Sequence, residues 1–100
     1  MADDRDYAVV WNEENRPLPT AGKLLLIDHH VILIGNTPGE PRLVEFEHDE
    51  VEAIEIIRSP EARLNDRPTL AIALRDGTVL HIRELGRFGA LAEIADAIAA

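Results

Sequence analysis

The sequence contains no cysteine among its 100 residues, which excludes disulfide bonds, thiolate metal sites and thiol catalysis. Aromatic residues are scarce at 4%, whereas 46% of the residues are hydrophobic, so we expect a core built mainly from aliphatic side chains. No apolar run approaches the roughly 20 residues that a membrane helix requires. The chain is therefore expected to fold as one small domain spanning residues 1–100.

Basic residues are also few: ten Lys and Arg stand against 19 Asp and Glu, giving a formal net charge of −9. The imbalance lies in residues 1–57, with 13 acids and 4 bases, because residues 58–100 carry six of each. Nucleic acids and anionic membranes are bound by Lys and Arg that neutralise phosphate, so we expect neither as a partner. A basic protein or a cation is compatible with this charge.

The first six residues are acidic, whereas a secretory leader begins with basic residues. We therefore expect residues 1–6 to form a disordered acidic N-terminus and the chain to be cytoplasmic.

Short segments rich in aliphatic and β-branched residues, separated by turn-forming residues, predict six or seven β-strands. The expected strands cover residues 7–11, 23–27, 31–34, 42–47 and 51–57, with two more inside residues 70–85. Residues 12–22 and 59–68 are polar and contain prolines, which is typical of loops. Within residues 42–47, alternation predicts Val44 and Phe46 on one face and Leu43, Glu45 and Glu47 on the other.

Two turns set the register of the expected hairpins. Residues 28–30 are predicted to be a three-residue connection. A two-residue turn at Asp76 and Gly77 would mix apolar and polar positions on one face. A three-residue loop over residues 75–77 instead places Leu70 and Ile72 on one face with Leu80 and Ile82, which is preferred, and it requires a positive φ at Gly77.

The C-terminal segment changes to a helical period. Leu91, Ile94, Ala95 and Ile98 form one stripe, and the many alanines favour helix, which predicts a helix over residues 89–100. The predicted fold class is mainly β with one C-terminal α-helix (α+β): an antiparallel, partly open barrel that the helix caps.

This order of elements resembles the pleckstrin-homology-like fold of small bacterial domains and GRAM-type modules. The segments that carry the resemblance are residues 22–33 as an opening hairpin, 42–46 leading into 51–54, and 74–79 followed by the helix. The resemblance implies a binding or self-assembly module rather than an enzyme. Lipid-binding members carry Lys and Arg around the first hairpin, whereas here that hairpin offers only Lys23, so phosphoinositide binding is not expected.

The hairpin over residues 23–34 is aliphatic on both faces, although a half-exposed antiparallel strand normally alternates with polar residues. One face carries Leu24, Leu26, Ile32 and Ile34, and the other carries Leu25, Ile27, Val31 and Leu33. The second set is predicted to form a homotypic interface, so we expect a homo-oligomer.

The acidic residues of the middle segment give an alternative function. Glu45, Glu47, Glu52 and Glu55 are predicted to be either a solvated surface or a patch for a basic protein partner, as in an acidic inhibitor or adaptor.

A metal site is a weaker prediction than either interaction surface, and its candidate ligands are His29, His30, His48 and Asp28. His29 and His30 lie with Asp28 in one turn, and a site would also need His48 or Asp49 from the next loop; exposed turn histidines are the alternative. No catalytic residue and no cofactor-binding motif is predicted.

Overall fold

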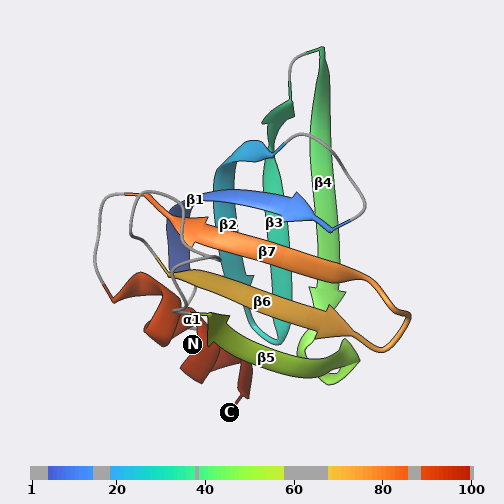
Figure 1. Ribbon diagram of the computed structural model, residues 1–100, viewed down its shortest axis with the longest axis vertical. Coiled ribbons are helices and arrows are strands. Elements are labelled where there is room, and N and C mark those ends of the chain that lie inside the picture. Colours follow the sequence, from blue (N-terminus) through green and yellow to red (C-terminus); the bar gives the residue numbers. More distant parts are fainter. Residues whose placement is uncertain (1–4, 15–18, 38, 58–67, 86–88, 100) are drawn as a thin grey trace.

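A computed structural model describes residues 5–14, 19–37, 39–57, 68–85 and 89–99. Within these ranges, seven antiparallel strands form one curled sheet and a single helix follows them (Figure 1). The elements are β1 (Arg5–Glu13), β2 (Thr20–Ile27), β3 (His30–Thr37), β4 (Glu40–Glu47), the 3-10 helix η1 (His48–Glu50), β5 (Val51–Ile57), β6 (Thr69–Leu74), β7 (Val79–Glu84) and α1 (Ala90–Ala99). The predicted fold class is confirmed.

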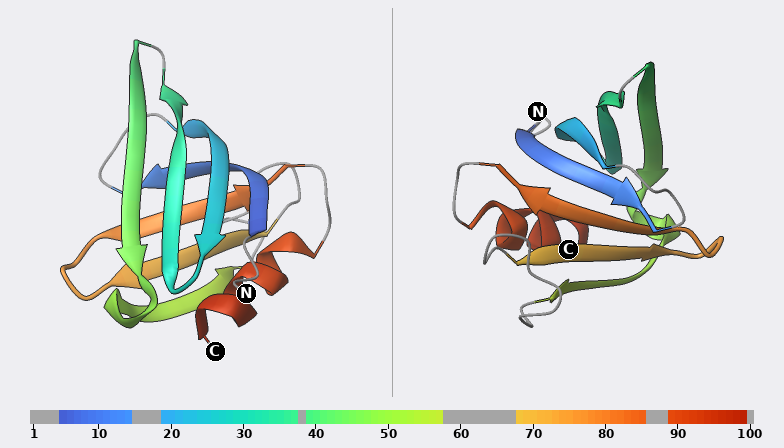
Figure 2. Two further views of the ribbon diagram at one scale, coloured as in Figure 1. Left: turned by 180° about the vertical axis from the view of Figure 1, so that it is seen from behind. Right: turned by 45° about the horizontal axis from the view of Figure 1, so that its top comes forward.

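The sheet has the strand order β4-β3-β2-β1-β7-β6-β5, so β4 and β5 are its two edges. It bends into two halves that cross each other and enclose the core, as the views in Figure 2 show. Strand β1 joins the halves, because it pairs with β2 through residues 5–11 and with β7 through residues 9–13. The core side chains of the strands are Tyr7, Val9, Trp11, Leu24, Leu26, Val31, Leu33, Phe46, Leu70, Ile72, Leu74, Leu80 and Ile82.

The helix α1 packs against β5, β6 and β7. Leu91, Ile94 and Ile98 are buried on its inner side, and Ala95 is partly buried, which confirms the predicted stripe. The buried carboxylate of Glu84 accepts a hydrogen bond from the Leu91 backbone N–H at 3.2 Å, so β7 fixes the start of the helix.

The turn between β6 and β7 agrees with the prediction. Leu70 lies opposite Ile82 and Ile72 opposite Leu80, and all four are buried. Gly77 has a φ of 96°, and the Thr78 backbone N–H donates to Asp76 Oδ1 at 2.8 Å. That hydrogen bond lowers the pKa of Asp76. A three-residue loop with a left-handed glycine therefore sets this register.

The turn between β2 and β3 differs from the prediction. Ile27 pairs with His30, so the connection has two residues, Asp28 and His29, and Asp28 adopts a positive φ of 59°. The shorter turn shifts the pairing by one residue and exchanges the two faces of β3. Val31 and Leu33 are fully buried in the core, and the prediction that they form an outer interface with Leu25 and Ile27 is wrong.

The predictions for the N-terminal part of the chain also differ from the structure. Arg5 and Asp6 belong to β1, and Asp6 forms an ion pair with Lys23 at 3.6 Å, so disorder through residue 6 is wrong for these two residues. Residues 1–4 lie outside the described residues, as do residues 59–67 of the predicted loop. The first hairpin is β1–β2, so the segment that resembled an opening hairpin is the second hairpin.

Candidate interaction surface

The outer side of β2, β3 and β4 carries large aliphatic residues that no described element covers. We call this set the aliphatic face: Leu25, Ile27, Ile32, Ile34 and Leu43. Ile27 is 38% exposed and Leu43 is 64% exposed, while the other three are half-buried by their neighbours on the sheet. Contiguous exposed aliphatic side chains are typical of protein contact surfaces.

Charged residues border the aliphatic face, and several are already paired within the chain. His30 Nδ1 lies 3.5 Å from Glu45 Oε1, and His30 Nε2 lies 3.7 Å from Glu47 Oε1. On the other side, Lys23 pairs with Asp6. These exposed pairs contribute little to stability, but they place a charged border around an apolar centre, which is the usual anatomy of a protein interface.

A groove of about 610 Å³ lies beside Leu43. Its lining residues are Ala21, Gly22, Lys23, Ile34, Gly35, Asn36, Pro41, Arg42 and Leu43. Gly22 pairs with Gly35 across β2 and β3, where the backbones approach so closely that a Cβ on Gly22 would lie 2.0 Å from the Ile34 carbonyl oxygen. The glycine pair therefore permits the close approach of the β2 and β3 backbones at this point.

On the inner side of the same bend, Trp11 and Arg42 pack together. The Trp11 Nε1–H donates to the Ile34 carbonyl oxygen at 3.1 Å, and the Arg42 guanidinium lies 5.8 Å from the centre of the indole ring. Arg42 also forms a half-buried ion pair with Glu13. Sequence reasoning missed this cluster, although two glycines in aliphatic strands and the single tryptophan were signals for it.

The four predicted acidic contact residues are all exposed, but they lie on two different strands. Glu45 and Glu47 are on β4, whereas Glu52 and Glu55 are on β5, at the opposite edge of the sheet. A register shift between Val51 and Ala53 leaves Glu52 outside the regular pairing of β5 with β6. The run is therefore continuous in sequence but divided between the two sheet edges.

Three histidines, His29, His30 and His48, lie where the β2–β3 turn meets η1. The His48 backbone N–H donates to the His29 carbonyl oxygen at 2.9 Å, and the two imidazole rings meet edge-on with centres 5.7 Å apart. A shallow pocket there also contacts Asp28, His30 and Asp49, so the structure brings the predicted candidates together. Within the described ranges, however, no group of three or more His, Cys, Asp or Glu side chains is placed to hold a metal ion.

Within this corner, burial acts on the protonation of His48. Desolvation lowers the pKa of His48 below 6.5, and the nearby imidazoles of His29 and His30 lower it further by repulsion. His48 is therefore held in its neutral form more firmly than a free histidine.

No family model matches the sequence, and no curated protein matches it significantly. Two solved structures are similar over nearly the whole chain. The C-terminal domain of an unknown protein from Leishmania infantum has a TM-score of 0.67 at 15% identity, covering 96% of this chain and 83% of that chain. The pleckstrin homology domain of ArhGAP27 has a TM-score of 0.61 at 12% identity, covering 99% of this chain and 96% of that chain.

The chain has a pleckstrin-homology-like fold. The resemblance seen in residues 22–100 is thus confirmed for the fold, and it includes β1 as well. A third structure, an SsgA-like sporulation-specific cell division protein from Thermobifida fusca, has a TM-score of 0.48 at 11% identity, covering 98% of this chain and 80% of that chain. In the described part of this pleckstrin-homology-like fold, no helix has the length and apolar character needed to cross a membrane.

Proposed function

We propose that the chain is a non-enzymatic protein-interaction module that associates with a second copy of itself through the aliphatic face. The observation that carries the proposal is Leu43, a large aliphatic side chain that is 64% exposed on the edge strand β4 and stands next to a groove. A protruding leucine and an adjacent hollow on one face are self-complementary. A twofold arrangement lets each copy place its Leu43 in the groove of the other.

Charge supports a second copy as the occupant. A chain with a net charge of −9 repels its own copies unless the acids near the contact are offset. Beside the aliphatic face, Asp6 is paired with Lys23, and Glu45 and Glu47 lie next to His30, which offsets part of their charge only when it is protonated. The described lining residues of the groove include no acid, and its two basic residues, Lys23 and Arg42, are paired with Asp6 and Glu13.

The test is the native mass by light scattering at low and high salt, on the wild type and on Leu43→Glu. A defined dimer is expected for the wild type at both salt concentrations, because an apolar contact is not screened. Leu43→Glu is expected to be a folded monomer, because a charge inside an apolar contact is strongly unfavourable.

The matched control is Leu85→Glu, which places the same change at a residue that is 43% exposed and lies after β7, outside the aliphatic face. It is expected to leave the dimer intact. A monomeric wild type, or equal effects of the two substitutions, contradicts the proposal.

A basic protein partner is the second candidate, favoured by the exposure of Glu45 and Glu47 on one edge strand. A lysine-rich peptide added as a probe is then expected to bind at low salt and to dissociate as salt rises, with loss of binding in the double variant Glu45→Gln, Glu47→Gln. The double variant Glu52→Gln, Glu55→Gln on β5 is the control. Equal losses in both pairs would indicate only a general effect of net charge.

A further inference from the structure

A second hollow lies on the outer side of the other half of the sheet, away from the aliphatic face. Its volume is about 450 Å³, and its lining residues are Val10, Trp11, Asn12, Pro19, Ile57, Thr69, His81 and Arg83. Pockets of this size hold small organic ligands.

Strand pairing explains why these residues meet. Val10 on β1 lies opposite Arg83 on β7, and Ile57 on β5 lies opposite Thr69 on β6. Because Leu70 pairs with Ile82, the same register places Thr69 beside Arg83. Val10, Arg83, Thr69 and Ile57 therefore form one row across four strands, with a cation between two aliphatic side chains.

Three of the other four Lys and Arg side chains in the described ranges have partners within the chain. Lys23 pairs with Asp6, Arg42 pairs with Glu13, and Arg75 donates to the Asp49 carbonyl oxygen at 2.9 Å. The Arg83 Nε, in contrast, is buried and has no hydrogen-bond partner among the described residues. A buried donor without an acceptor is unfavourable, so this pocket presents a guanidinium that lacks an anion.

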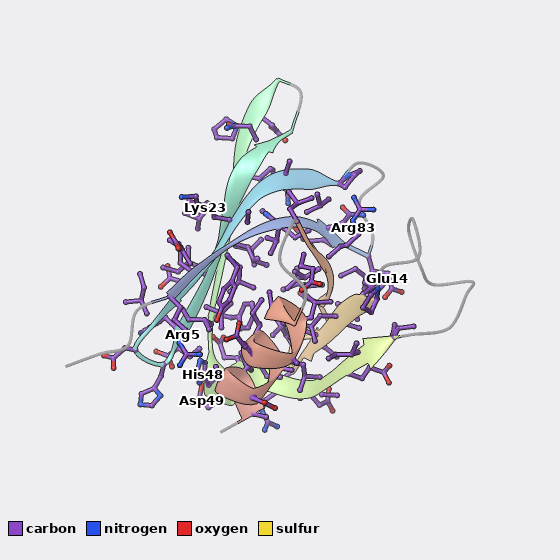
Figure 3. The ribbon with its side chains drawn as sticks, turned by 90° about the vertical axis from the view of Figure 1, so that its left-hand side faces the viewer. Arg5, Glu14, Lys23, His48, Asp49 and Arg83 are labelled. Atoms are coloured by element: carbon purple, nitrogen blue, oxygen red, sulfur yellow. The ribbon has the colours of Figure 1, made fainter. Side chains whose placement is uncertain are left out.

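Glu14, an acid on this side of the molecule, is directed at a different residue. Glu14 Oε2 lies 3.8 Å from His81 Nε2, one row away from Arg83. Figure 3 shows Arg83 and Glu14 on one side of the molecule, and Arg5, His48 and Asp49 on the other. Glu14 is thus directed at His81, and the described residues in the row of Arg83 are apolar or carry a hydroxyl: Val10, Thr69 and Ile57.

We propose that this pocket binds a small carboxylate with an apolar body. The carboxylate accepts the donors of Arg83, whose planar fork matches its two oxygens, and the apolar body packs on Val10, Ile57 and Pro19. A single arginine among apolar walls suits a monoanion. A polyhydroxylated or multiply phosphorylated ligand would leave several polar groups without partners in the same space.

The probe is octanoate, titrated below its micelle concentration and followed by calorimetry and by backbone amide chemical shifts. Saturable binding of one octanoate per chain is expected, with the largest shifts at Val10, Thr69 and Arg83. Octanol has the same apolar body without the charge, and its affinity is expected to be at least about tenfold lower. Inorganic phosphate is expected not to compete with octanoate. Shifts centred on Leu25, Ile32 and Leu43 would place the ligand on the aliphatic face and overturn the proposal.

The deciding variant is Arg83→Gln, which keeps a polar hydrogen-bonding side chain but shortens it and removes its charge. It is expected to weaken octanoate binding about tenfold or more while octanol binding stays unchanged. Arg5→Gln is the matched control, an exposed arginine on the same sheet that is expected to have no effect. If Arg83→Gln does not fold, Arg83→Lys keeps a charge, loses the fork, and is expected to give an intermediate loss. Unchanged affinity in the folded Arg83 variant, or equal binding of octanol and octanoate, overturns the proposal.

Discussion

The two halves of the sheet bury their inner faces alike but differ on their outer faces. Inside, each half contributes alternating aliphatic residues: Leu24, Leu26, Val31 and Leu33 from the first, and Leu70, Ile72, Leu80 and Ile82 from the second. Outside, the first half carries the aliphatic face, whereas β6 carries Ala71 and Ala73. Strand β6 shows that a strand of this sheet needs large aliphatic residues only on its inner face. The large residues on the outer side of β2, β3 and β4 therefore need another explanation, and contact with a partner supplies it.

The largest effect is expected from shortening two neighbouring residues of β3, one on the inner face and one on the outer face. Leu33→Ala removes a fully buried side chain and is expected to lower the free energy of unfolding by about 2–5 kcal/mol. Ile32→Ala lies on the aliphatic face, so it is expected to cost less than half as much and to weaken self-association instead. Urea denaturation of both variants measures the first effect, and light scattering measures the second. The reverse order of stabilities would mean that the three-residue turn at 28–30 was right.

The two halves also differ in how well their strand register could be predicted from the sequence. The register of β6 and β7 was predictable because only one pairing kept Leu70, Ile72, Leu80 and Ile82 together, and Gly77 marked the turn. The register of β2 and β3 was not, because both faces are aliphatic and neither pairing separates apolar from polar residues. The residue type of Asp28 was a local signal for the shorter turn, because aspartate tolerates the left-handed conformation that it adopts here.

The surfaces were less predictable than the fold. Leu25 and Ile27 were correctly placed on an outer face, but Ile32, Ile34 and Leu43 joined them only once the register was known. The pocket at Arg83 combines residues from four strands that are distant in sequence, so no local pattern indicates it. Such sites depend on which strands become neighbours, and periodicity does not state that.

A smaller effect is expected from substituting one glycine in each half of the sheet, Gly22 and Gly77. Gly22→Ala places a Cβ 2.0 Å from the Ile34 carbonyl oxygen and 2.6 Å from Gly35 Cα, and backbone atoms on both strands must move. We expect a loss of about 1–3 kcal/mol, together with weaker self-association because Ile34, whose backbone must move, belongs to the aliphatic face. Gly77→Ala has open space around it but a positive φ, so a loss of about 1 kcal/mol is expected, with no change in native mass. Thermal unfolding and light scattering distinguish the two, and equal effects would remove the special role of the bend.

The smallest expected effect concerns the corner where the first half passes into the second through η1. Burial and the charges of His29 and His30 lower the pKa of His48 below 6.5, so the unfolded chain binds a proton there more readily than the folded chain. The stabilisation that follows is present above pH 6.5 and is lost as the pH falls toward the pKa of the folded state. Its slope stays below the single-proton limit of about 1.4 kcal/mol per pH unit. Urea midpoints at pH 7.5 and 5.5 should therefore differ less in His48→Gln than in the wild type. His29→Gln removes only one of the repelling charges and should retain part of the difference. A pH dependence that survives unchanged in His48→Gln would assign it to other groups and leave this corner a passive link between the two halves.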